Sequence, residues 1–155
     1  MHREIKSIAN ALDNEKTFEI IKNGSYGVLS TIGENGYPYG TPLNYSYWDE
    51  CICFHCARQG YKIENIDFTN KVSFCIVTRS DILANKFDTD YESAIVFGTA
   101  MEVTEDSEKT DILMSIINKY SADYVEAGKN YMKKYWDETK VFKIAIDHVT
   151  GKAHV

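Results

Sequence analysis

The sequence predicts a mainly β fold, a small closed or split antiparallel barrel of about six strands with helices outside it. Short segments in which apolar and polar residues alternate recur along the chain, as in half-buried strands. The turn Gly33–Gly36 ends in Asn-Gly and predicts a hairpin between two of these segments. Helical periodicity is confined to the start of the chain, one short crossover and the region before the last strand, which favours a barrel with peripheral helices.

Composition limits the classes of function. The chain has 155 residues and a formal net charge of −6. We therefore expect a single domain over residues 1–155 and no nucleic-acid partner, because phosphate backbones need a basic face. No apolar run is long enough to cross a membrane, and the charged segment Met1–Asn10 contains no signal region, so we expect a cytoplasmic protein. The four cysteines then fit reduced thiols.

Two helical segments are predicted at the N-terminus. The first depends on apolar residues at helical spacing: Ile5, Ile8 and Leu12. The second begins after Asp13, a residue type that caps helices, and runs to Ile21. We expect Gly24 to end it in a left-handed conformation.

The first hairpin joins strands predicted at Tyr26–Ile32 and from Tyr37 through Tyr47. The second strand contains Pro38 and Pro42. Because proline has no backbone N–H, we expect this strand at an edge or bulge of the sheet, where free backbone groups remain available to a ligand.

The middle of the chain alternates strands with short connections. After a turn at Trp48–Glu50, the predicted elements are a strand at Cys51–Cys56, a short helix opening near Gly60, and strands at Lys71–Arg79 and Ser93–Thr104. Gly98 indicates a bulge or a close backbone contact in the last of these. The segment 80–90 has little periodicity and is expected to be an irregular excursion.

The C-terminal third begins with a helix opening at Thr104–Glu108. Its apolar stripe consists of Ile112, Leu113, Ile116, Ile117 and Tyr120. One or two short helices are expected within 121–137. A last strand at Val141–Ile146 and a turn at Thr150–Lys152 follow.

The segment Phe54–Lys62 carries the strongest functional signal. His55 lies at the end of a strand, Gly60 permits close approach to the backbone, and Lys62 falls in the first turn of the next helix. Free amides at a helix start and a nearby ammonium favour a phosphate. Imidazole donates, accepts or changes charge near neutral pH, so His55 can orient a bound ring or relay a proton.

The neighbouring strand offers further polar contacts, from Thr41, Asn44 and the carbonyls near Pro42. Arg58 either adds a planar cation to the phosphate or is simply an exposed loop residue.

The cysteines of the strand at Cys51–Cys56 allow two other readings. Cys51, Cys53 and His55 share a face, but same-face neighbours stand about 7 Å apart and no second cluster completes a tetrahedral zinc site. We therefore expect no metal. Cys56 points away from His55, so the two form a poor nucleophile–base pair.

Five segments together carry a resemblance to a known family. They are Gly36–Asn44, Phe54–Lys62, Ser93–Gly98, Glu108–Lys109 and Thr150–Lys152. In this order, and over nearly the whole chain, they resemble the 5-nitroimidazole antibiotic resistance family, within the pyridoxamine 5′-phosphate oxidase-like flavin-binding superfamily. The pattern Phe-His-x-Ala-x-x-Gly-x-Lys is the most specific match.

The resemblance implies an antiparallel six-stranded split β-barrel that forms a homodimer with FMN, or FAD, at each subunit interface. Lys62 would contact the flavin phosphate, the loop Ala57–Gly60 would wrap it, and His55 would lie near the ring as the catalytic residue. The implied cofactor-binding residues are Thr41, Pro42, Leu43, Asn44, His55, Cys56, Ala57, Gly60 and Lys62. Tyrosines or Trp136 are expected from the second subunit.

The implied activity is that of a flavin-dependent oxidoreductase that reduces a small acceptor such as a nitroaromatic or a nitroimidazole. Three alternatives stay open. The first is a flavin-binding or storage protein without turnover, and the second is a pyridoxamine-phosphate-oxidase-like enzyme with another substrate. The third is a haem binder in which His55 ligates iron.

Overall fold

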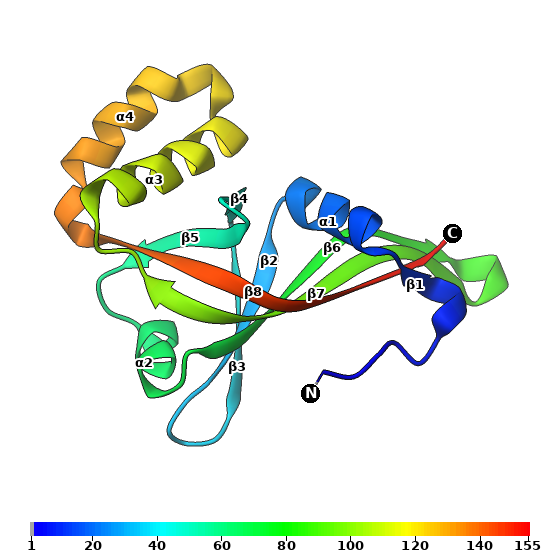
Figure 1. The fold of residues 1–155 in the computed structure, drawn as a ribbon. Coiled ribbons are helices and arrows are strands. Elements are labelled where there is room, and N and C mark those ends of the chain that lie inside the picture. Colours follow the sequence, from blue (N-terminus) through cyan, green and yellow to red (C-terminus); the bar gives the residue numbers. More distant parts are fainter. Residues whose placement is uncertain (1) are drawn as a thin grey trace.

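The structure is a computed structural model that describes residues 2–155. One antiparallel sheet of eight strands curls into a half-open barrel, in the order β3-β2-β6-β7-β8-β5-β4, with β1 paired to β8 (Figure 1). The long strands are β2 (Gly27–Ile32), β3 (Pro38–Leu43), β5 (Cys51–Ala57), β6 (Lys71–Leu83), β7 (Asp88–Glu102) and β8 (Thr139–His154). The short strands are β1 (Ala11–Leu12) and β4 (Ser46–Trp48). The predicted six-stranded split barrel is confirmed, with β1 and β4 as short additions.

The α-helices lie outside the barrel. They are α1 (Asn14–Asn23), α2 (Tyr61–Phe68), α3 (Asp106–Tyr120) and α4 (Val125–Lys134). Helix α1 packs across β6, β7 and β8, whereas α3 and α4 stand together at the other end of the molecule, above β5 (Figure 1). None of the described helices is long and apolar enough to cross a membrane.

Strand β5 is covered on both faces, and this arrangement positions the site. Ile52 and Phe54 point into the main core inside the barrel. Cys53 points the other way, into a second buried cluster beneath α3 that includes Ile112 and Val141. His55 follows on the same outer face as Cys53, so the strand delivers its imidazole to the space under α3 and α4.

Several local predictions are confirmed. The side chain of Asp13 caps α1 and accepts a hydrogen bond from the Lys16 amide at 2.9 Å. Strand β3, which contains both prolines, is an edge strand of the sheet. The pairing of β7 with β8 shifts register between Phe97 and Gly98, as expected for a bulge.

Two predictions near the N-terminus are wrong. Residues 5–12 do not form a helix: only a 3-10 turn, Ile8–Asn10, precedes β1, and β1 pairs with Gly151 and Lys152 of β8 instead. Gly24 is extended, with φ −63° and ψ 139°, and is not left-handed. A Cβ at Gly24 would collide with the side chains of Ile76 and Tyr45, so close packing requires glycine there.

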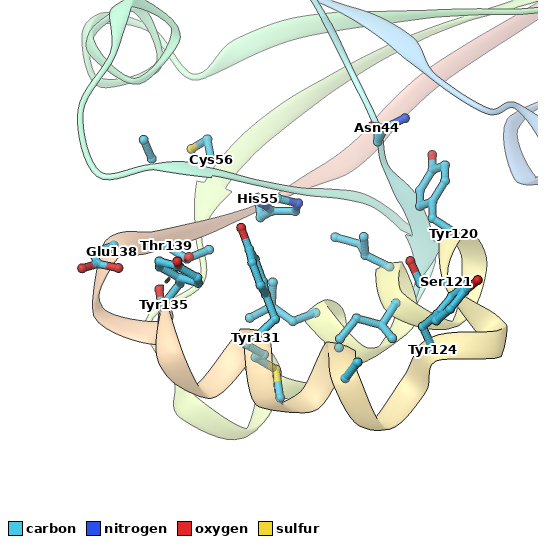
Figure 2. A pocket seen from close by; sticks show the side chains of 17 residues that line it. Asn44, His55, Cys56, Tyr120, Ser121, Tyr124, Tyr131, Tyr135, Glu138 and Thr139 are labelled. Carbon is cyan, nitrogen blue, oxygen red and sulfur yellow. Dashed lines mark hydrogen bonds between the residues drawn. The ribbon is translucent and has the colours of Figure 1, made fainter.

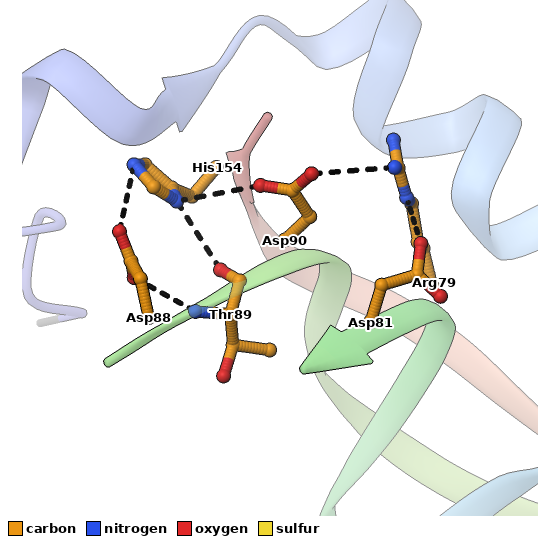
Figure 3. Close-up of polar contacts among 6 residues, drawn as sticks. All are labelled: Arg79, Asp81, Asp88, Thr89, Asp90 and His154. Atoms are coloured by element: carbon orange, nitrogen blue, oxygen red, sulfur yellow. Dashed lines mark hydrogen bonds and ion pairs between the residues drawn. The ribbon is translucent and has the colours of Figure 1, made fainter. Parts of the chain in front are cut away.

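Two predictions about β6, β7 and β8 are also wrong. The segment 80–90 is not irregular: β6 and β7 continue as a long hairpin that turns at Ala84–Lys86. The side chains of this hairpin are mostly polar and pair with one another, so the sequence shows no apolar alternation there. Arg79, for example, contacts Asp81 and Asp90 (Figure 3). Residues 150–152 belong to β8, where Gly151 lies against Thr17 of α1.

Candidate functional site

A pocket of about 760 Å³ lies between β5 and the α3–α4 pair (Figure 2). Strand β5 supplies His55, Cys56 and Ala57, and α3 supplies an apolar base that includes Leu113 and Ile116. The aromatic lining residues are Tyr120, Tyr124, Tyr131 and Tyr135. Pockets of this size and lining are typical of sites for drug-sized molecules and cofactors.

His55 projects from β5 into this pocket and faces α4 (Figure 2). Its side chain remains accessible through the pocket, but the surrounding protein removes enough water to lower its pKa. The ammonium of Lys62 lowers the pKa of His55 further. Both effects disfavour the charged imidazolium and so favour the neutral imidazole, which has one donor and one acceptor nitrogen.

The start of α2 lies just beyond the end of β5. Gly60 precedes the helix without a side-chain cap, and its carbonyl accepts from the amides of Ile63 and Glu64. The amides of Tyr61 and Lys62 therefore come before the first helical hydrogen bonds. A Cβ built at Gly60 would meet no heavy atom within 4 Å, so the space over this loop is open.

Lys62 adds positive charge at this end of β5. Burial raises the pKa of the Cys56 thiol, and the ammonium groups of Lys62 and Lys140 oppose that shift. Lys62 therefore acts electrostatically on both His55 and Cys56, and the structure brings these three predicted site residues together.

The predicted site residues in β3 and directly after it divide into two groups. Asn44 lines the pocket and donates to the Ser25 carbonyl at 3.0 Å. Thr41, Pro42 and Leu43 pair with β2 and do not line this pocket. The hydroxyl oxygen of Thr41 is buried and has no hydrogen-bond partner among the described residues.

Helix α4 supplies residues that the sequence reasoning did not assign. Tyr124 immediately precedes it and Tyr135 immediately follows it, with Tyr131 between them. Spacings of seven and four residues put the three rings on one helix face, a signal that was present in the sequence. All three belong to the same chain as His55, and a contribution of tyrosines from a second subunit stays a prediction.

Two other candidates are engaged elsewhere. The guanidinium of Arg58 donates to the Asp137 carbonyl at 2.8 Å. Trp136 packs against the second core cluster, and the Lys109 ammonium lies 4.2 Å from the centre of its ring. Among the residues that the structure describes, no group of three or more His, Cys, Asp or Glu side chains is placed to hold a metal ion.

Comparisons with solved structures show the same fold. A candidate 5-nitroimidazole antibiotic resistance protein from Bacteroides thetaiotaomicron superposes with a TM-score of 0.76 at 23% identity, covering 92% of this chain and 85% of that one. A conserved hypothetical protein from Mycobacterium tuberculosis superposes with a TM-score of 0.82 at 18% identity, covering 99% of this chain and 91% of that one. An FAD-binding protein from Mesorhizobium loti superposes with a TM-score of 0.65 at 19% identity, covering 94% of this chain and 97% of that one.

Sequence comparison adds the family. No curated protein sequence matches the chain. The sequence profile described as pyridoxamine 5′-phosphate oxidase matches residues 13–153, nearly the whole chain. The protein therefore belongs to the pyridoxamine 5′-phosphate oxidase family.

Proposed function

We propose that this protein is a homodimeric flavin-dependent oxidoreductase, built as one domain, that binds FMN and reduces a small acceptor such as a nitroaromatic. The observation that carries the proposal is the position of His55. It lies between a pocket lined by aromatic rings and a helix start that bears Lys62. A phosphorylated cofactor that passes electrons to an acceptor needs an anion site for its phosphate, next to a pocket that admits its ring along β5 and the acceptor beside that ring.

The residues present fit a flavin. Lys62 and the first amides of α2 would hold the phosphate, Gly60 would leave room for it, and Ala57 at the end of β5 would lie beside it. His55 and Cys56 would lie along the ring, with Asn44 at the end of β3. The unpartnered hydroxyl of Thr41 supports a polar ligand contact near Pro42 and Leu43, since buried hydroxyls rarely lack a partner. The fold shared with an FAD-binding protein adds support and keeps FAD as an alternative.

A bound flavin would supply a hydride, and one further proton would complete the conversion of a nitro group to a nitroso group and water. The protein's part is positioning and proton supply. The neutral imidazole of His55 can donate one hydrogen bond to an acceptor oxygen while its other nitrogen accepts from water. Leu113 and Ile116 form the apolar base of the pocket.

The proposal is tested on the purified protein. We expect flavin absorbance bands, bleaching under anaerobic conditions with a reduced nicotinamide, and reoxidation when a nitroaromatic is added, with equal loss of the nitro compound. His55→Ala should lower turnover more than it lowers flavin retention. Flavin that is retained but never reoxidised by the acceptor would instead support a storage or carrier protein. A haem spectrum, or a colourless protein that takes up no flavin, would refute the proposal.

A further inference from the structure

We infer that Tyr124, Tyr131 and Tyr135, called here the tyrosine wall, bind the acceptor as a flat, uncharged ring opposite His55. Tyr131 would be the main specificity-determining residue. The inference rests on the proposed function and assigns the two sides of the pocket different tasks. Strand β5 and the start of α2 hold the cofactor, and the tyrosine wall holds the acceptor.

The exposure of the wall is the first argument. Tyr124 is 70% exposed and Tyr131 is 67% exposed, although both rings line the pocket on the side of α4 that faces the protein (Figure 2). Rings that belonged to a packed core would be buried. The rings of Tyr131 and Tyr135 lie 4.6 Å apart and are tilted by 48° to each other, so they form two adjoining aromatic faces. Such faces favour stacking with a planar ligand.

The support beneath the wall is the second argument. Gly128 of α4 lies against the side chain of Ile117 on α3, where a Cβ would come within 2.9 Å. This close approach packs α4 against α3, and the tyrosines of the α4 segment line the same pocket as β5. No residue of α4 is itself buried, so the tyrosines contribute little to the core and are available for ligand binding.

The charge of the lining is the third argument. Among the residues that line the pocket, Glu138 is the only one with a charged side chain, and none is lysine or arginine. An anionic substrate would therefore find no cation among the lining residues and would meet a carboxylate, whereas the Lys134 ammonium lies beside the Tyr135 ring, 5.3 Å from its centre, outside the lining. Lys62 is outside the pocket lining and is assigned to the cofactor. A phosphate ester is consequently a poor acceptor here, whereas a neutral aromatic ring fits.

The test uses a matched pair of probes, 4-nitrobenzyl alcohol and 4-nitrobenzyl phosphate, titrated by calorimetry into flavin-loaded protein without an electron donor. We expect the alcohol to bind about ten-fold more tightly than the phosphate. Tyr131→Ala should raise the Kd of the alcohol about ten-fold, while the flavin Kd and the melting temperature stay unchanged. Tyr37→Ala is the matched control, since Tyr37 is 73% exposed outside the pocket, and should change none of these values.

The outcomes separate the two proposals. A protein that retains no flavin would overturn the proposed function before any titration begins. Retained flavin with an unchanged alcohol Kd in Tyr131→Ala would overturn the tyrosine wall alone. Equal weakening of flavin and alcohol would also overturn it, because the rings would then hold the cofactor. Tighter binding of the phosphate ester than of the alcohol would refute the assigned substrate class.

Discussion

His55 has a pKa below that of a free imidazole, first because the surrounding protein removes water from the imidazole and second because of Lys62. We expect an NMR titration of His55 to give a midpoint below 6.5, the ordinary pKa of a histidine side chain. Lys62→Met should raise the pKa of His55 part of the way toward 6.5, because the loss of water around the imidazole remains in this variant. A midpoint at or above 6.5 in the parent protein would contradict the position proposed for the imidazole.

The lowered pKa of His55 also sets the sign of a pH effect on stability. An unfolded chain protonates His55 near pH 6.5, whereas the folded chain does so only at lower pH. Between those values the unfolded state binds more protons, so this residue lowers the free energy of unfolding as pH falls below 6.5. In His55→Gln, this part of the pH dependence should disappear from urea titrations.

Lys62 is expected to hold the flavin phosphate by a charge-assisted contact. Lys62→Ala should weaken flavin affinity by about 1.5–3 kcal/mol, or about ten- to a hundred-fold, measured by fluorescence titration of flavin into apoprotein. Lys16→Ala, an equal charge change in the first turn of α1, is the control and should leave the affinity unchanged. An equal loss in both variants would mean that only the net charge matters.

At the scale of elements, Gly98 determines how closely β7 approaches β8. A Cβ there would lie 2.5 Å from the Ala145 carbonyl oxygen, and a backbone atom cannot move aside as a flexible side chain can. Gly98→Ala should lower the free energy of unfolding by about 1–3 kcal/mol. Gly40→Ala on the edge strand β3, whose Cβ would lie 3.3 Å from a methyl of Val28, should cost less. Urea denaturation of both variants provides the comparison.

Helix α4 differs from the strands in how it is held. No residue of α4 is buried, whereas β6, β7 and β8 contribute Phe74, Val96 and Ile144 to the core. We expect the amides of α4 to exchange hydrogen through local openings, at a much lower free energy than the amides of these strands. Binding of 4-nitrobenzyl alcohol should slow exchange in α4. Equal protection of α4 and β7 in the unliganded protein would contradict this.

The sequence-based predictions were accurate where burial in the core sets the residue pattern of an element, and they failed where pairing with a distant strand determines the structure. Strands with one buried face, such as β2 and the first half of β6, show clean alternation because the core imposes it. The prediction failed where long-range pairing supplies the structure. Residues 11–12 form a strand only because β8 offers partners, and residues 80–90 stay extended through cross-strand pairs that have no apolar periodicity.

At the scale of the whole molecule, half of the candidate site was accessible from sequence. His55, Gly60 and Lys62 are close in the chain, so their spacing alone brought them together. The tyrosine wall lies about seventy residues further along the chain. It lies near His55 only because α3 and α4 pack over β5. The helical spacing of Tyr124, Tyr131 and Tyr135 indicated a shared face, but the partner of that face depends on tertiary structure.

A homodimer is expected from the family resemblance, and the barrel offers a surface for it. Ile95 is 40% exposed and Val77 is 47% exposed on the outer face of the β6–β7 hairpin. The strand registers place Ile95 opposite Cys75, and Cys75 opposite Val28 on β2. The result is an apolar row across three strands, a kind of surface that soluble proteins usually cover.

Sedimentation velocity should therefore give a species of twice the 17.7 kDa chain mass. Ile95→Lys should shift it to the monomer, because a desolvated ammonium without a partner is costly at an interface. Since the flavin is expected at that interface, the same variant should weaken flavin binding in a way that depends on protein concentration. Ile8→Lys, at an isoleucine that is 82% exposed, should leave both properties unchanged. A monomeric variant that keeps full flavin affinity would place the whole cofactor site within one chain.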